Sequence, residues 1–155
     1  MIKKFLIFFL VLLFLQGCGY QAIYSGKNLN FSIENLITVG DKGLNRFISK
    51  RLDNLNIENK TENAYKLNIN SKATKSIAAK DKQGIPSTYT LTVNIEMLYS
   101  LENSLQKSKS FSETINYSNR DNKFQLKKYE NTSKENLTDK IIDNIILFLQ
   151  NDSSQ

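Results

Sequence analysis

Hydrophobic residues recur at every second position in several stretches of the chain, which is the spacing of a strand with one buried face. Polar segments at 80–86 and 102–108 separate the later stretches, and 80–86 contains the glycine and proline typical of a hairpin tip. Strands that are neighbours in sequence and joined by short turns usually pair antiparallel, so we expect a meander. The stretches with this pattern are 31–37, 65–79, 89–101 and 111–117.

Two other segments carry hydrophobic residues at steps of three and four, the spacing of an amphipathic helix. Asp41 is placed to cap the first helix, and a polar connection at 56–63 follows it. The apolar face of this helix comprises Leu44, Phe47, Ile48, Leu52 and Leu55. The second helix covers about 122–150, and its stripe comprises Leu126, Tyr129, Ser133, Leu137, Ile141, Ile145 and Leu149. We interpret both stripes as core packing.

The order strand, helix, three strands, helix predicts an α+β fold. We expect a two-layer sandwich, in which two helices cover a mostly antiparallel four-stranded sheet. This single domain is expected to span 31–150. The polar, glycine-containing segment 18–30 is expected to be a tether, and 151–155 a flexible tail.

The N-terminus departs from these patterns. A basic start with Lys3 and Lys4 precedes an unbroken apolar run over 5–15. That run is shorter than the roughly 20 residues that a membrane-spanning helix needs. A charged start, a short apolar run and a small-residue exit are typical of a secretory signal peptide, so residues 1–17 are expected to be removed.

The exit reads Leu15-Gln16-Gly17-Cys18, which resembles the bacterial lipobox. The resemblance implies cleavage before Cys18 and lipidation of its thiol, with enough acyl chains for stable membrane attachment. The alternative is a plain secreted protein with a chance cysteine near the cleavage point. We favour the lipoprotein because the only cysteine of the 155 residues stands at the required position.

The composition restricts the chemistry further. The chain has no histidine, and lipidation of its one cysteine would leave no free thiol. Histidine-based triads, Cys/His pairs and His- or Cys-ligated metals are therefore excluded. Asp and Glu are scattered, so we expect neither an enzyme nor a bound metal or cofactor. Loss of Lys3 and Lys4 leaves 19 basic and 15 acidic residues. A mature charge of +4 fits an anionic partner such as lipid phosphates, and no motif indicates nucleic acid.

Several short motifs stand in a recognisable order. They are Gly17-Cys18-Gly19-Tyr20, Gly84-Ile85-Pro86-Ser87-Thr88-Tyr89-Thr90-Leu91-Thr92-Val93, Tyr99-Ser100-Leu101, Tyr117-Ser118-Asn119 and Phe124 before a long helix. Together with the order of elements, they cover nearly the whole mature chain. In this combination the chain resembles the LptE family of lipopolysaccharide-assembly lipoproteins.

The resemblance implies a structural role in transport. Family members sit as a plug in the lumen of an outer-membrane β-barrel, LptD, and the pair places lipopolysaccharide in the outer leaflet. The expected partners are therefore this barrel, lipopolysaccharide and the membrane that holds the lipid anchor. The expected location is the outer membrane, on its periplasmic side or within the barrel. Gly19, rather than aspartate, after the cysteine fits sorting to that membrane.

Lys82 in 80–86, and Lys127 or Lys128 near the start of the final helix, lie where family members carry basic residues. They are candidates for contact with lipopolysaccharide, and the alternative is that each is a solvated surface lysine.

Two other functions remain open at this point. One is a periplasm-facing scaffold lipoprotein of another envelope-assembly machine, for which helical repeats would be commoner than this strand-rich pattern. The other is a lipid carrier with a cavity between sheet and helices. The bulky residues on the strand faces favour a filled core instead.

Overall fold

The computed structural model describes residues 29–56, 63–101 and 104–154. The elements are β1 (Ser32–Gly40), α2 (Lys42–Asn56), β2 (Ala64–Lys80), β3 (Pro86–Leu101), β4 (Lys107–Ser118) and α3 (Lys123–Asp152). The α+β class and the expected order of elements are confirmed. The signal peptide and most of the tether, the connection at 57–62, residues 102–103 and the side chain of Leu55 lie outside the described residues.

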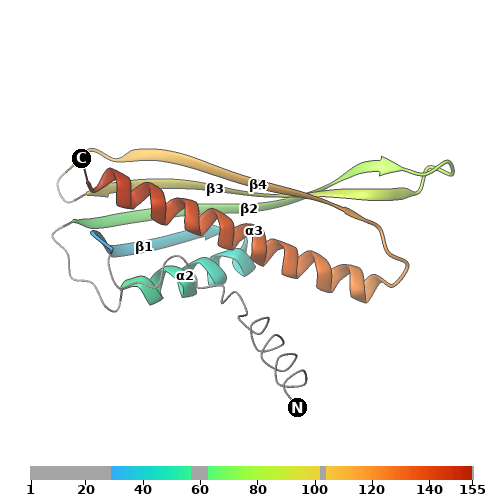
Figure 1. Cartoon of the computed structure of the whole chain (residues 1–155), viewed down its shortest axis with the longest axis horizontal. Helices are drawn as coiled ribbons and strands as arrows, with labels where there is room; N and C mark the ends of the chain where they lie inside the picture. Colours follow the sequence, from blue (N-terminus) through green and yellow to red (C-terminus); the bar gives the residue numbers. More distant parts are fainter. Residues whose placement is uncertain (1–28, 57–62, 102–103, 155) are drawn as a thin grey trace, which may run out of the picture.

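The four strands form one sheet in the order β1-β2-β3-β4. As expected, β2, β3 and β4 form an antiparallel meander. β1 pairs parallel to β2 at the other edge, because α2 carries the chain back along the sheet before β2 begins. Figure 1 shows the β2–β3 hairpin continuing past the end of the helical layer.

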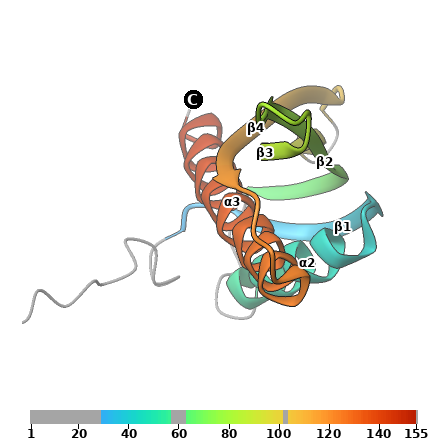
Figure 2. The ribbon, with the colours of Figure 1, turned by 90° about the vertical axis from the view of Figure 1, so that its right-hand side faces the viewer.

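Both helices cover the same face of the sheet, α2 beside β1 and α3 across β3 and β4 (Figure 2). The alternation predicted for β3 places its apolar residues on this face. Leu91, Val93, Ile95 and Met97 are each at most 1% exposed. From the helices, Ile48, Leu52, Ile141, Ile142, Ile145, Ile146 and Leu149 fill the space opposite them. The two predicted stripes are therefore core packing.

β1 continues to Gly40, three residues beyond the expected strand 31–37. Gly40 adopts φ 103°, and a Cβ there would lie 2.0 Å from the carbonyl oxygen of Ser71. A residue without a side chain therefore ends the strand. The Oδ1 of Asp41 then accepts hydrogen bonds from the backbone N–H groups of Gly43 and Leu44, at 2.8 and 3.2 Å. The predicted cap is confirmed.

Three expected boundaries need correction. α3 runs to Asp152 rather than Gln150, so residues 151 and 152 form helix and not a flexible tail. Leu29 is buried, and the side-chain amide of Asn30 donates to the carbonyl of Gln150 and the hydroxyl of Ser154. The end of the expected tether is therefore part of the domain. Polar groups from distant segments donate hydrogen bonds to the last carbonyls of α3 and so extend the helix. Hydrophobic periodicity carries no information about such bonds. β4 also begins at Lys107, four residues before the expected strand 111–117.

Candidate functional site

Two surfaces of the described residues carry chemistry that packing alone does not require. The first is the end of the molecule where the β2–β3 hairpin and the start of α3 lie, which we call the basic end. It comprises Lys80, Lys82, Arg120, Lys123, Lys127 and Lys128, with Phe124 among them. The second is the face of the sheet turned away from the helices, which we call the outer sheet face.

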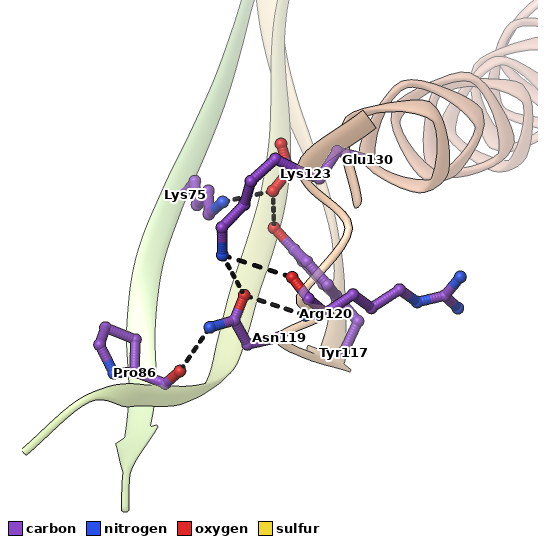
Figure 3. A network of polar contacts seen from close by, with 7 residues as sticks. All are labelled: Lys75, Pro86, Tyr117, Asn119, Arg120, Lys123 and Glu130. Carbon is purple, nitrogen blue, oxygen red and sulfur yellow. Dashed lines mark hydrogen bonds and ion pairs between the residues drawn. The ribbon is translucent and has the colours of Figure 1, made fainter. Parts of the chain in front are cut away.

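Asn119 ties the hairpin to the turn before α3 at the basic end. Its backbone N–H donates to the carbonyl of Ser87, and its Nδ2 donates to the carbonyl of Pro86, both at 2.8 Å. Its Oδ1 accepts from the backbone N–H of Arg120 at 2.9 Å and from the Nζ of Lys123 at 3.4 Å. Figure 3 shows the bonds of the Asn119 side chain to Pro86, Arg120 and Lys123. The turn leading into α3 is thus fixed relative to the hairpin.

A partly buried ion pair lies near this turn, with the Lys75 side chain 37% exposed. Glu130, 8% exposed, accepts from Lys75 and, at 2.8 Å, from the hydroxyl of Tyr117 (Figure 3). Lys75 also lies over the ring of Tyr89, with Nζ 3.9 Å from the ring centroid. Burial raises the pKa of Glu130, but the hydrogen bonds from Lys75 and Tyr117 and the nearby positive charge outweigh it. The net pKa lies below the usual value. Glu130 is therefore held ionised and joins β2, β4 and α3.

The first turns of α3 carry an unusual charge pattern. Lys123, Lys127 and Lys128 are all exposed, and the first turn contains no acidic residue. Cations at a helix N-terminus oppose the helix dipole, typically at a cost of about 0.3–1 kcal/mol each. Phe124 stands among them with 79% of its surface exposed. This combination presents positive charge next to an accessible aromatic ring.

The candidate residues from the sequence divide between two elements. Lys127 and Lys128 lie on α3 and line one shallow hollow together with Phe124. Lys82 lies in the tight turn of the hairpin, where the Oδ1 of Asp81 accepts from the backbone N–H groups of Gln83 and Ile85. All three lysines are exposed, and the β2–β3 hairpin and the start of α3, which carry them, lie at the same end of the molecule (Figure 1). Lys82 does not line that hollow. Cys18 lies outside the described residues.

Sequence reasoning missed the ion pair and three basic residues of the basic end, Lys80, Arg120 and Lys123. Arg120 lies over the ring of Tyr129, 4.8 Å from its centroid, and Lys123 bonds to Asn119. A signal for the ion pair was present, because Lys75 continues the inward-facing alternation that begins at Tyr65. A charged residue at an inward-facing strand position requires a partner.

Across β2, β3 and β4 the outer sheet face is mostly polar and carries few charges. Leu98 is an exposed apolar residue within it, and Ile37 and Val39 of β1 are exposed beside it. Cross-strand rows on β2, β3 and β4 are Asn68–Leu98–Ser108, Asn70–Glu96–Ser110, Lys72–Asn94–Ser112, Thr74–Thr92–Thr114 and Ser76–Thr90–Asn116. Only Lys72 and Glu96 in these rows are charged. Hydroxyl and amide groups bond across the strands, Thr90 to Asn116 at 2.8 Å and Thr92 to Thr114 at 3.0 Å. The face therefore offers a broad field of neutral hydrogen-bonding groups.

Metal binding finds no support on either surface. Among residues 29–56, 63–101 and 104–154, no three acidic side chains come close enough together to hold an ion. The helices in these ranges also include none that is both long and apolar enough to cross a membrane.

Several solved structures share this fold. The rare lipoprotein B from Shewanella oneidensis superimposes with a TM-score of 0.55 at 15% identity, covering 76% of this chain and 97% of that one. A minor lipoprotein from Acinetobacter baumannii gives 0.55 at 9% identity, covering 81% and 93%. An uncharacterized lipoprotein B from Nitrosomonas europaea gives 0.54 at 10% identity, covering 77% and 84%. No protein-family model and no curated sequence matches this chain. At such low identity the likeness establishes the fold alone.

Proposed function

We propose that this chain is a lipid-anchored outer-membrane protein that acts as plug and assembly partner of the lipopolysaccharide-transport β-barrel. In this role it helps to insert lipopolysaccharide into the outer leaflet and performs no catalytic step. The lipobox ending at Cys18 supports the anchor. The solved proteins of the same fold, described as bacterial lipoproteins, support it too. The LptE resemblance of the sequence supports the choice of barrel.

The outer sheet face carries this proposal. A soluble protein usually covers an exposed sheet face with charged side chains, which remain hydrated at little cost. Here the face presents hydroxyl and amide groups that can donate and accept hydrogen bonds without burying unpaired charge. The interior of a transmembrane β-barrel is polar. A neutral polar face can lie against such a wall, whereas a densely charged face would need a matching charge for each side chain.

The test is recovery of the barrel with the protein. We expect a tag placed after Gln155 to co-purify a large β-barrel from membranes extracted in mild detergent. The double variant Thr92→Arg/Thr114→Arg places two charges at the centre of the outer sheet face and should abolish this recovery. The control Thr132→Arg/Asn136→Arg adds the same charge at exposed positions of α3. Recovery of no barrel by the unmodified chain would refute the proposal. Equal recovery by the sheet-face variant would refute the assigned face.

At the basic end, we propose contact with lipopolysaccharide through Lys82, Lys127 and Lys128. Lipopolysaccharide combines phosphates with hydrocarbon, and lysines beside an exposed Phe124 match both parts. The first turn of α3, which holds Lys123 and Phe124, adds the partial positive charge of its free N–H groups to the same end. Arg120 and Lys123 extend the same surface toward the hairpin.

Binding of purified lipopolysaccharide tests this contact. The variant Lys127→Gln/Lys128→Gln should bind about fivefold to thirtyfold more weakly, because each charge-assisted hydrogen bond lost at an exposed site is worth about 0.5–1 kcal/mol. The control Lys72→Gln/Lys109→Gln removes the same charge from the sheet. A larger loss of binding in Lys127→Gln/Lys128→Gln than in the control supports the contact. Equal losses in the two variants would show that only net charge matters.

A further inference from the structure

A second charged surface lies on α2, away from the basic end and from the outer sheet face. Lys42, Arg46 and Lys50 follow one another at steps of four residues, and all three are exposed. Four residues advance a helix by about 6 Å and return nearly to the same side, so these cations form one straight row about 12 Å long. We call this row the α2 stripe. It lies opposite the buried residues Leu44, Ile48 and Leu52 and therefore faces solvent.

The stripe is not neutralised within the described residues. Arg51, one residue further on, shows the contrast, because it pairs with Asp139 at 2.8 Å and lies near Asp143 at 3.6 Å. No such ion pair includes any member of the stripe. Asp53 stands on the same helix side, and Asp41, Glu135 and Lys134 line a hollow with Arg46. None of these carboxylates forms an ion pair with the stripe. Like charges four residues apart destabilise a helix by about 0.2–0.5 kcal/mol per pair, so folding does not explain this row.

The form of the stripe indicates the kind of partner. Cations that converge on a cavity suit a single phosphate, whereas a straight row on a convex helix surface suits a plane of negative charge. The described chain begins at Leu29, three residues before β1, and α2 packs against β1. Ten residues, 19–28, separate Leu29 from Cys18. The eleven backbone steps from Cys18 to Leu29 span at most about 40 Å, so the anchor leaves α2 within reach of a bilayer surface.

We infer that the α2 stripe docks on the anionic phospholipid headgroups of the membrane that holds the chain. The helical layer then faces the membrane and the outer sheet face points away from it. This orientation belongs to the anchored protein before it enters a larger assembly. The inference does not depend on the barrel or on lipopolysaccharide, because it concerns a different element and a different ligand.

The experiment uses residues 18–155 with Cys18→Ser, so that lipid attachment does not mask weaker binding. Co-sedimentation is measured with vesicles of 30% phosphatidylglycerol in phosphatidylcholine and with vesicles of phosphatidylcholine alone, at low salt. We expect binding to the anionic vesicles only, with loss at high salt. The variant Lys42→Gln/Arg46→Gln/Lys50→Gln should partition about 100-fold more weakly, at roughly fivefold per lost charge.

A matched control separates the stripe from net charge. The variant Lys66→Gln/Lys72→Gln/Lys109→Gln removes three exposed charges from the sheet, outside both the stripe and the basic end, and should keep most of the binding. Circular dichroism confirms that both variants are folded. The inference is overturned if the unsubstituted chain does not bind anionic vesicles, if the stripe variant binds equally well, or if both triple variants lose the same amount.

Discussion

The hydroxyl of Tyr65 donates a hydrogen bond of 2.8 Å to the Oδ2 of Asp152, joining the start of β2 to the last turn of α3 across 87 residues of sequence. Lys107 of β4 approaches the same carboxylate at 3.5 Å. The rings of Phe31 and Tyr99 lie 5.9 and 6.2 Å from that of Tyr65. One phenol thus closes the end of the sandwich where the chain enters the domain and where α3 ends.

Tyr65→Phe removes this bond and leaves the ring in place. We expect a loss of about 1 kcal/mol in the free energy of unfolding, because a hydrogen bond to a carboxylate is lost while Lys107 still compensates Asp152. Urea denaturation at pH 7 measures it. Ser110→Ala on the exposed sheet face serves as control and should change stability by less than about 0.5 kcal/mol. An unchanged midpoint in Tyr65→Phe would show that the bond contributes nothing.

The same tyrosine should make the fold sensitive to alkali. Burial first, and then the hydrogen bond to Asp152, raise the pKa of Tyr65 above its usual value. Burial and Glu130 raise the pKa of Tyr117 in the same direction. A raised folded-state pKa contributes stability that is fully present below the unfolded-state pKa of about 10 and is lost as the pH rises above it. Stability should fall above about pH 10, less steeply in Tyr65→Phe, as urea midpoints at stepped pH would show.

Glu130 should control stability at acid pH. Its folded-state pKa is lowered, so its contribution is present above the unfolded-state value of about 4.3 and is lost as the pH falls below it. Glu130→Gln leaves Lys75 without its counter-charge and should cost about 1–3 kcal/mol at pH 7. This is less than for a fully buried pair, because the Lys75 side chain is 37% exposed. The difference from the unsubstituted chain should shrink below pH 4. Glu135→Gln, at an exposed position of the same helix, is the control.

Two glycines with positive φ offer a matched comparison. Gly40→Ala adds a Cβ that would lie 2.0 Å from the carbonyl oxygen of Ser71. We therefore expect the free energy of unfolding to fall by about 3 kcal/mol or more, or the chain not to fold. Gly84→Ala, at φ 80° with nothing within 4 Å of the new Cβ, should cost only about 1 kcal/mol. Thermal unfolding distinguishes them, and equal losses would contradict the role assigned to the close approach.

Cys18→Ser should release the protein from membranes into the soluble periplasmic fraction, because the thiol to be acylated is gone. Fractionation followed by an immunoblot measures this, and Ser25→Ala serves as a control that leaves the cysteine in place. The membranes are washed at high salt before fractionation, which removes charge-mediated contacts such as the one inferred for the α2 stripe. Persistence of Cys18→Ser in the washed membrane fraction would refute the lipid tether.

Much of the fold could be predicted because its elements are local in origin. Alternation from Tyr65 and from Tyr89 predicted the strands and which face of each is buried. Steps of three and four from Leu126 to Leu149 predicted the long helix and its buried stripe. These patterns reflect the backbone repeat of each element, so they can be read without knowing what packs against them.

The candidate site was predictable only in part. The sequence singled out Lys127 and Lys128, but their common hollow with Phe124 depends on where α3 begins. Lys75 and Glu130 are 55 residues apart, and neither position indicates the other. The pair forms only when α3 packs against the sheet that contains β2.

By itself, the sequence determined the order of the elements, their buried faces and the motif that ends at Cys18. The tertiary structure alone decided the parallel pairing of β1, the helical end of α3 at Asp152, and the contacts that hold the basic end together. The physical reason is the range of the interactions. Periodicity depends on residues a few positions apart in sequence, so it can be read before the chain folds. The polar pairs Tyr65 with Asp152 and Lys75 with Glu130 join residues far apart in sequence, and they form only after the chain has folded.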